Sequence, residues 1–383
     1  MTPRRLAAAC ALSLLLAGCG VFGTMRNHIP RTKRPGPEIL DDGYSDHAGV
    51  IHIHTTYSDG AGTFEDVARA ANQQHLDYRI VTDHNTLQPL RDGKQGWYGM
   101  TLVLVGTELS TPAGHYLAMG ITEDISQHQP TQAIIDAVNT QGGLGFIAHP
   151  YFKKRRWTDW TVTGYTGMEA YNLVHDAYDE NRWRLALWGV MTTPSQLYLS
   201  LVDRPYDPLS MWDRLLARHT KVVGIGSSDA HEFRLFGIKF APYEILFQLV
   251  RTHILTTEPT LSPTVVYDAL RRGHAYCSID MVGDPTGFVF MTDDHTKPVA
   301  IMGDEVALRP DLQLTAVTPA PGEMSLFKDG VKIGTFTGTV WHVPVSEPGV
   351  YRLEVMRHGK PWIISNPMYL TRSDEPFGAN AWP

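Results

Sequence analysis

The sequence Gly49-Val-Ile-His-Ile-His-Thr-Thr-Tyr-Ser-Asp-Gly60 joins an apolar run to two histidines and an aspartate. His52 and His54 are spaced i, i+2, so in an extended strand both imidazoles point to the same face and can reach one ion. Asp59 adds a carboxylate, and this ligand mixture suits zinc, manganese or iron. Taken alone, the pattern fits ordinary strand histidines equally well, and the rest of the chain must decide.

Four later apolar runs carry the same kind of residue at their ends. Each run is short and rich in β-branched or apolar residues, which is typical of a buried strand. A further candidate, His115, begins the apolar run 114–121. The four runs are 78–84, 101–108, 142–150 and 221–231, and the candidates at their ends are His84, Glu108, His149, Asp229 and His231.

Helical patterns alternate with these strands at 63–75, 131–140, about 175–190 and 208–219, and residues 167–172 form a further strand. Strands alternating with helices predict right-handed βαβ units and a parallel sheet. An open doubly wound sheet would draw its site from a few strands at a switch point. Ligands at the ends of five or six strands instead favour an α/β barrel.

Composition sets the limits on function. The 383 residues are 43% hydrophobic, enough for a full core and two domains, and the net charge of −7 gives no nucleic-acid-binding signature. Six imidazoles and three carboxylates exceed the needs of one tetrahedral zinc and suit two or three divalent ions. With neutral imidazoles, three ions leave this site at +3 and two leave it at +1, which favours a small anionic substrate such as a phosphate ester.

In this order, the five motifs resemble those of the PHP (polymerase and histidinol phosphatase) superfamily of metal-dependent hydrolases over residues 47–282. The resemblance implies a distorted seven-stranded (β/α) barrel and a phosphoesterase that uses metal-activated hydroxide. It implies catalytic roles for Glu108, Asp229 and His231, with Glu108 bridging two ions. The implied ligands are His52, His54, Glu108 and Asp229 for one ion, Glu108, His115 and His149 for a second, and Asp59, His84 and His231 for a third.

For other polar residues the sequence gives weaker indications of a functional role. Arg234 and Lys153 could bind substrate phosphate, although solvated charges are the commoner outcome. Asp83 could orient an imidazole or make a local turn hydrogen bond, and Cys277 suits a buried apolar position. Eleven histidines lack the strand-end pattern and are expected to be surface or hydrogen-bonded residues: His28, His47, His75, His128, His175, His219, His253, His274, His295, His342 and His358.

The N-terminus reads as a targeting segment. Arg4 and Arg5 precede the apolar run 6–16, which is too short to span a bilayer. Leu16-Ala-Gly-Cys19 resembles a bacterial lipoprotein cleavage box, which implies a signal peptide at 1–18, lipidation of Cys19 and a tether at 19–46. This predicts a lipid-anchored protein on the periplasmic face of the cell envelope, with the outer membrane favoured by Gly20. The alternative is an ordinary secretory signal that contains a cysteine.

The composition changes near residue 285. Short alternating runs separated by Asp329-Gly330 and other turns predict an all-β, Ig-like sandwich over 285–383, after the barrel at 47–284. The runs 349–355 and 361–367 resemble the C-terminal part of the carbaryl-hydrolase-like branch of the PHP superfamily. That resemblance keeps carbamate or carboxylic ester hydrolysis open as an alternative to phosphoester hydrolysis. A surface lipoprotein that only binds ligands is the non-enzymatic alternative.

Overall fold

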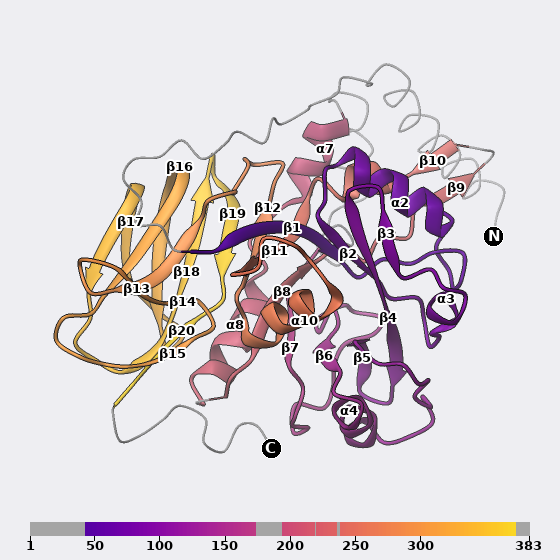
Figure 1. Ribbon diagram of the computed structural model, residues 1–383, viewed down its shortest axis with the longest axis horizontal. Helices are drawn as coiled ribbons and strands as arrows, with labels where there is room; N and C mark the ends of the chain where they lie inside the picture. The colour runs from indigo at the N-terminus through magenta and orange to yellow at the C-terminus, as the bar shows by residue number, and fades with distance from the viewer. Residues whose placement is uncertain (1–42, 174–193, 219, 236–237, 373–383) are drawn as a thin grey trace.

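The computed structural model describes residues 43–173, 194–218, 220–235 and 238–372. Within these ranges the chain has a mixed α/β fold with few helices and one hydrogen-bonded network of eighteen strands, plus a separate hairpin of β9 (Phe233–Leu235) and β10 (Ile238–Phe240). Figure 1 shows β16 (Gln313–Lys328), β17 (Val331–Pro344) and β18 (Gly349–Arg357) at one end of the long axis. It shows β3 (Gly96–Tyr98), β4 (Thr101–Thr111) and β5 (Gly114–Met119) towards the other end. The predicted lipoprotein segment and the helix expected near 175–190 lie outside the described residues.

The strands that carry the site form a mixed sheet. Parallel pairs join β1 to β2, β2 to β4, β6 to β7 and β7 to β8. β5 runs antiparallel to both β4 and β6. The expectation of a wholly parallel sheet is therefore wrong at β5, because only Pro112 and Ala113 connect it to β4 and a parallel pair needs a long crossover. These strands are β1 (Ser45–Ile51), β2 (Tyr78–Val81), β4 (Thr101–Thr111), β5 (Gly114–Met119), β6 (Leu144–Ile147), β7 (Gly167–Asn172) and β8 (Val223–Ser227).

Backbone hydrogen bonds connect the end of β8 to the end of β1. Ser228 N donates to Ile51 O at 3.1 Å, Ala230 N donates to His52 O at 3.2 Å, and His54 N donates to Ala230 O at 2.9 Å. The first and last strands of the series therefore meet, and their ends deliver side chains to the same place. The seven-stranded barrel and the Ig-like sandwich remain predictions of the sequence.

The helices begin and end close to where the sequence places them. Thr63 and Asp66 form a capping box at the start of α2 (Phe64–Gln73). α4 (Thr131–Thr140) has the predicted bounds, and α8 (Tyr206–Leu216) is shifted by two to three residues from 208–219. The other described helices are α3 (Gln88–Arg91), α7 (Pro194–Leu201), α9 (Tyr243–Leu246) and α10 (Pro263–Arg272).

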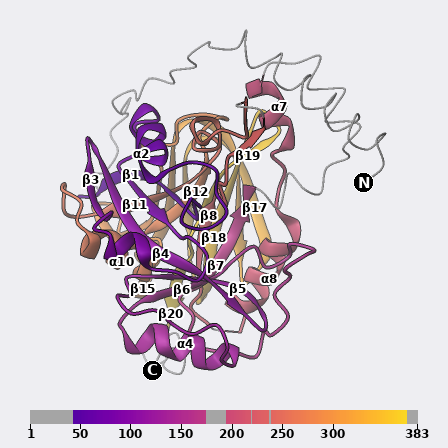
Figure 2. The same cartoon turned by 90° about the vertical axis from the view of Figure 1, so that its right-hand side faces the viewer.

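The core packs against both faces of the sheet. The first nine residues of β4 are buried, as expected for a strand covered on two sides. Val103 and Val105 belong to one cluster of buried apolar residues, while Leu102 and Leu104 belong to another. Figure 2, turned by 90° from Figure 1, shows α4 below these strands and α2 above them. The site strands are thus held rigidly by apolar packing.

The C-terminal strands confirm the predicted hairpin at Asp329-Gly330. Both residues have positive φ, 50° and 79°, as a type I′ turn requires. The strands it joins, β16 (Gln313–Lys328) and β17 (Val331–Pro344), are longer than the short runs expected, and a register shift between Val317 and Gly322 lets β16 continue as one strand.

The region after residue 285 continues the hydrogen-bonded network of the first part. β12 (Ala275–Ile279) pairs antiparallel with β19 (Lys360–Ser365), and β1 reaches β12 through β11 (Val250–Thr256). The remaining strands are β3 (Gly96–Tyr98), β13 (Val289–Asp293), β14 (Pro298–Ile301), β15 (Glu305–Ala307), β18 (Gly349–Arg357) and β20 (Met368–Thr371). Among the described residues, no helix has the length and apolar character needed to cross a membrane.

Candidate metal centre

Three of the candidate ligands stand just beyond strand ends in an uncommon backbone conformation. His52, His149 and Asp229 have φ values of 67°, 24° and 48°. For residues with a Cβ this region is costly, and such strain concentrates at functional sites. The i, i+2 argument assumed that His52 lies in an extended strand, and this is wrong. Its imidazole nevertheless reaches Glu108 Oε2, as that of His54 does.

Glu108 lies at the centre of the cluster. Its Oε1 is 2.8 Å from His115 Nδ1 and 2.9 Å from His149 Nε2. Its Oε2 is 3.2 Å from Nε2 of both His52 and His54 and 3.1 Å from His84 Nδ1. The two carboxylate oxygens thus face two different groups of imidazoles, which is the arrangement expected of a bridging carboxylate.

Asp229 completes the group around Glu108 Oε2. Its Oδ1 is 3.3 Å from His52 Nε2 and 3.4 Å from His54 Nε2. In a tetrahedral site with bonds of 2.0–2.1 Å, neighbouring ligand atoms lie about 3.3 Å apart. The four nitrogen–oxygen separations, 3.2–3.4 Å, are therefore those of neighbouring ligands in a tetrahedral site.

A third group lies at the more exposed side of the cluster. His231 Nε2 is 3.3 Å from Asp59 Oδ1, and His84 Nε2 is 3.7 Å from Asp59 Oδ2. The Asp59 side chain is 56% exposed, whereas that of Glu108 is 1% exposed. His84 faces both groups, since its Nδ1 points to Glu108. The cluster therefore runs from a buried centre to an open rim.

Hydrogen bonding fixes which ring nitrogen of His52 faces the cluster. Its Nδ1 is 2.6 Å from Glu169 Oε1, so Nδ1–H donates to that carboxylate. Nε2 then presents a lone pair towards the oxygens of Glu108 and Asp229, and no hydrogen bond satisfies it. A lone pair facing two carboxylate oxygens is stable only with a cation or a proton between them.

The pKa shifts follow the same pattern. Burial opposes charge on His52, but Asp229, Glu108 and Glu169 outweigh it and raise its pKa well above the usual range. In the same way, burial is outweighed by the nearby carboxylates of Asp229 and Glu108, which raise the pKa of His54 to about 9. In the absence of metal, protons on these two rings thus supply the positive charge that a cation would supply between the rings and the carboxylates. Burial opposes ionisation of Glu108, yet the surrounding histidines hold its pKa well below the usual range.

All nine residues proposed from the sequence as ligands lie together, and four groups of three or four among them could hold a metal ion. Their role as ligands stays a prediction. Each candidate ion position has at least three side-chain donors of the nitrogen and oxygen types that zinc, manganese and iron accept. The nine residues are His52, His54, Asp59, His84, Glu108, His115, His149, Asp229 and His231.

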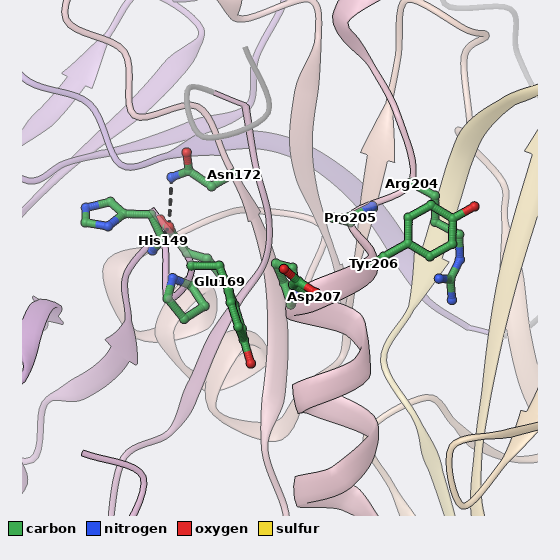
Figure 3. A pocket seen from close by; sticks show the side chains of 10 residues that line it. His149, Glu169, Asn172, Arg204, Pro205, Tyr206 and Asp207 are labelled. Atoms are coloured by element: carbon green, nitrogen blue, oxygen red, sulfur yellow. Dashed lines mark hydrogen bonds between the residues drawn. The ribbon is translucent and has the colours of Figure 1, made fainter. Parts of the chain in front are cut away.

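Glu169, on β7, is a site residue that the sequence reasoning missed. It is fully buried, and besides His52 it accepts hydrogen bonds from the His149 backbone N–H and from Asn172 Nδ2 at 2.8 Å. Figure 3 shows Glu169 between His149 and Asn172. Glu169 therefore orients one imidazole and the backbone of another. An acidic residue inside an otherwise buried strand was the available signal, because buried carboxylates need partners.

The Asp83 carboxylate bonds the loop that follows His54 rather than an imidazole. Its carboxylate accepts from Thr55 N at 2.8 Å, Thr55 Oγ1 at 2.7 Å and Ser58 Oγ at 2.6 Å. It thus fixes the turn between His54 and Asp59. Thr55 and Ser58 lie 25–28 residues from Asp83 in the sequence, so these bonds are neither the imidazole contact nor the local turn bond considered for Asp83.

The weaker candidates have mixed outcomes. Lys153 is exposed in the loop after His149. Arg234 lies on β9, but its side chain is outside the described part of the structure. Cys277 is buried, as expected, and burial raises its pKa. Of the remaining histidines, His253 is buried and hydrogen-bonded to Asp46 at 2.7 Å, which agrees with an ordinary structural role.

Comparisons with known proteins give remote similarities. No family model matches the chain. An uncharacterised protein of Methanocaldococcus jannaschii is 29% identical over 115 residues, which are 26% of this chain and 66% of that protein, so the match spans just under two thirds of the relative.

Among solved structures, a two-domain protein from Bacteroides vulgatus containing a predicted PHP-like metal-dependent phosphoesterase has a TM-score of 0.43 at 15% identity, covering 88% of this chain and 99% of that one. PsfC from Pseudomonas syringae has a TM-score of 0.39 at 13% identity, covering 59% and 89%. At these TM-scores the functional argument depends on the site itself.

Proposed function

We propose that this chain is a PHP-type metal-dependent hydrolase that cleaves phosphate esters at a trinuclear centre. The observation that carries the proposal is that Nε2 of both His52 and His54 lies 3.2–3.4 Å from Glu108 Oε2 and from Asp229 Oδ1. Two of these atoms are lone-pair nitrogens without a hydrogen bond, and two are anionic oxygens. Such a set of donor atoms fits a divalent cation.

The residues of this chain have distinct parts in that reaction. When bound, divalent ions would supply Lewis acidity and an activated water for attack on phosphorus. Glu108 and Asp229 hold the negative charge that concentrates the ions, and Glu169 holds His52 in the required tautomer. His231 donates Nδ1–H to the Asp229 carbonyl at 2.8 Å, which leaves its Nε2 to face Asp59 at the rim.

The number of carboxylates in the cluster favours three ions over two if the substrate is an anion. Besides Asp59, Glu108 and Asp229, the cluster includes Asp83 and Glu169, so five carboxylates stand within or directly against it. With neutral imidazoles, two divalent ions leave a net charge of −1, whereas three leave +1. A phosphate ester is attracted only in the second case.

The test is turnover by purified, metal-loaded protein. Phosphomonoesters, phosphodiesters and aryl carbamates are assayed in parallel, with metal content measured by elemental analysis. Hydrolysis of phosphate esters with up to three equivalents of bound metal is the expected result. Turnover of carbamates alone would overturn the phosphoester assignment, and bound metal without turnover of any substrate would favour a ligand-binding role.

We propose the cell envelope as its location, on the strength of the sequence around Cys19. A lipidated Cys19 followed by a tether to residue 46 would hold the catalytic part near a membrane surface. Cys19→Ser is expected to leave uncleaved precursor or soluble protein. Wild-type fractionation of this variant with membranes, checked by detergent extraction and mass, would contradict the proposal.

A further inference from the structure

A cleft of about 210 Å³ opens beside the metal-ligand cluster. His149, Glu169 and Asn172 line its inner side, and Tyr151, Tyr206 and Asp207 are among the residues that line the rest. Figure 3 shows His149 and Glu169 on one side and Arg204 and Tyr206 on the other. Because His149 contacts Glu108 and Glu169 contacts His52, the inner side of the cleft is the wall of the cluster itself.

The outer wall, residues 204–208, is held from the C-terminal strand β18. Arg204 donates from Nε and Nη2 to the two oxygens of Glu354, both at 2.7 Å. Arg352 bonds Glu354 at 2.6 Å and makes a two-pronged pair with Asp213 of α8 at 2.6 and 2.7 Å. Arg352 and Glu354 are buried. Bidentate pairs of this kind fix orientation as well as distance.

This network also determines the charge that the cleft offers a ligand. The two arginines and the two carboxylates neutralise one another, so the guanidinium of Arg204 is already matched. Arg204 is the sole arginine or lysine among the described residues that line the cleft, while Asp207 and Glu169 add negative charge. A second anionic group would find no unmatched cation among these lining residues; Arg156 and Arg214 contact the lining residue Tyr151 but are not themselves part of the lining. Tyrosine and proline side chains instead offer flat, largely apolar surface.

We propose that the cleft holds the alcohol part of the ester, an uncharged group about one ring in size, and that Glu354 positions the wall that selects it. This inference rests on the proposed phosphoesterase function. The volume is below the roughly 300 Å³ at which pockets for whole drug-sized ligands begin, so a single substituent fills it. The C-terminal strands thereby determine which esters fit a centre to which they contribute no ligand.

The experiment measures binding of two non-hydrolysable phosphonates to the metal-loaded full chain by calorimetry. Wild type is expected to bind phenylphosphonate at least about tenfold more tightly than methylphosphonate, because one group fills the cleft and the other does not. Glu354→Gln breaks one arm of the Arg204 pair and is expected to lose most of that preference. Its metal content and its affinity for methylphosphonate should stay at wild-type values.

Glu305→Gln is the matched control. Glu305 of β15 pairs with Lys221 at 2.7 Å, so it also joins the C-terminal strands to the first part of the chain, but it is not among the described residues that line the cleft. This variant should keep the wild-type preference. A second test variant, Asp207→Asn on the exposed rim, should improve binding of 4-carboxyphenylphosphonate relative to phenylphosphonate.

Each outcome decides the inference. Equal binding of the two phosphonates by wild type, or an unchanged preference in Glu354→Gln, would overturn it. If Glu354→Gln does not fold, an unchanged ligand ratio in Asp207→Asn would overturn the charge argument. Phosphonate discrimination in a metal-loaded protein that hydrolyses no phosphate ester would refute the proposed function while supporting the cleft assignment.

Discussion

Replacing Glu169 with Gln tests whether the cluster is organised for metal by groups that are not ligands. Glu169 uses one oxygen for His52 Nδ1 and the other for His149 N and Asn172 Nδ2. Glutamine has the same shape but only one acceptor oxygen, so its amide nitrogen must face at least one donor. Either His52 loses its orienting partner, or the buried His149 N–H does.

Two magnitudes follow. Loss of an orienting partner of a ligating histidine costs roughly 10–100-fold in metal affinity, or about 1.4–2.7 kcal/mol. A buried donor left without an acceptor costs about 1–3 kcal/mol of folding free energy, with or without metal. If the amide nitrogen faces His52, the stabilisation gained on metal binding should shrink by about 1.4–2.7 kcal/mol. If it faces the His149 N–H, the folding free energy should fall by about 1–3 kcal/mol with metal and without it.

The assay is competitive chelator titration for metal affinity, combined with urea unfolding in the presence and absence of metal. Glu354→Gln is the control, because Glu354 is also a buried, multiply bonded glutamate. It should lose folding free energy and keep wild-type metal affinity. Wild-type metal affinity together with wild-type folding free energy in Glu169→Gln would refute the reasoning, since neither His52 nor the His149 N–H would then depend on the second oxygen of Glu169.

Three further outcomes are expected. Glu108→Ala should lose at least two metal equivalents, because one carboxylate oxygen faces His115 and His149 and the other faces His52, His54 and His84. Wild-type metal content by elemental analysis would contradict the bridging role of Glu108. His253→Gln should cost about 3–5 kcal/mol at neutral pH. The burial of His253 is outweighed by Asp46 and Asp280, which raise its pKa to about 10, so this contribution is full below the unfolded pKa of about 6.5 and disappears as pH rises through about 10. Unfolding midpoints measured across pH 6–10 against the exposed His128→Gln check this, and a constant difference would contradict it. The fragment 47–284 should keep every proposed ligand yet aggregate, because it exposes the edge of β12 that pairs with β19; a soluble, monomeric fragment in light scattering would contradict this.

Local signals in the sequence were sufficient for much of the scaffold. α4 has its predicted bounds, and β4 is buried on both faces, because apolar periodicity reports burial directly. The sequence pattern predicts the direction of β5 wrongly, because the alternation of strands and helices does not report that only two residues connect β4 to β5. Strand direction depends on connection length, which a period-based interpretation of the runs does not measure.

The site was predictable as a set of residues but not as a geometry. Every proposed ligand follows or begins an apolar run, and strand ends meet in space. The positive φ of His52 was not predictable, because it follows from backbone hydrogen bonds to Ala230, far away in the sequence. Glu169 was missed for a related reason, since its partners come from β1, β6 and β7 and only the fold brings them together.

Two buried clusters of histidine and carboxylate on this fold show what separates a structural site from a functional one. Asp46 and Asp280 bind His253, but they also have Arg251, the Tyr276 hydroxyl and backbone N–H groups as partners, so their charge is matched within the protein. The partner side chains of Glu108 and Asp229, within the described chain, are all histidines, whose ring nitrogens are neutral at their ordinary pKa. Buried carboxylates surrounded only by imidazoles require positive charge, either as protons on the rings or as cations from outside the chain, and several ring nitrogens point to where a cation would bind. The histidines of the candidate metal centre are thus distinguished from His253 by carboxylate neighbours that have no arginine, hydroxyl or backbone N–H partner among the contacts described above.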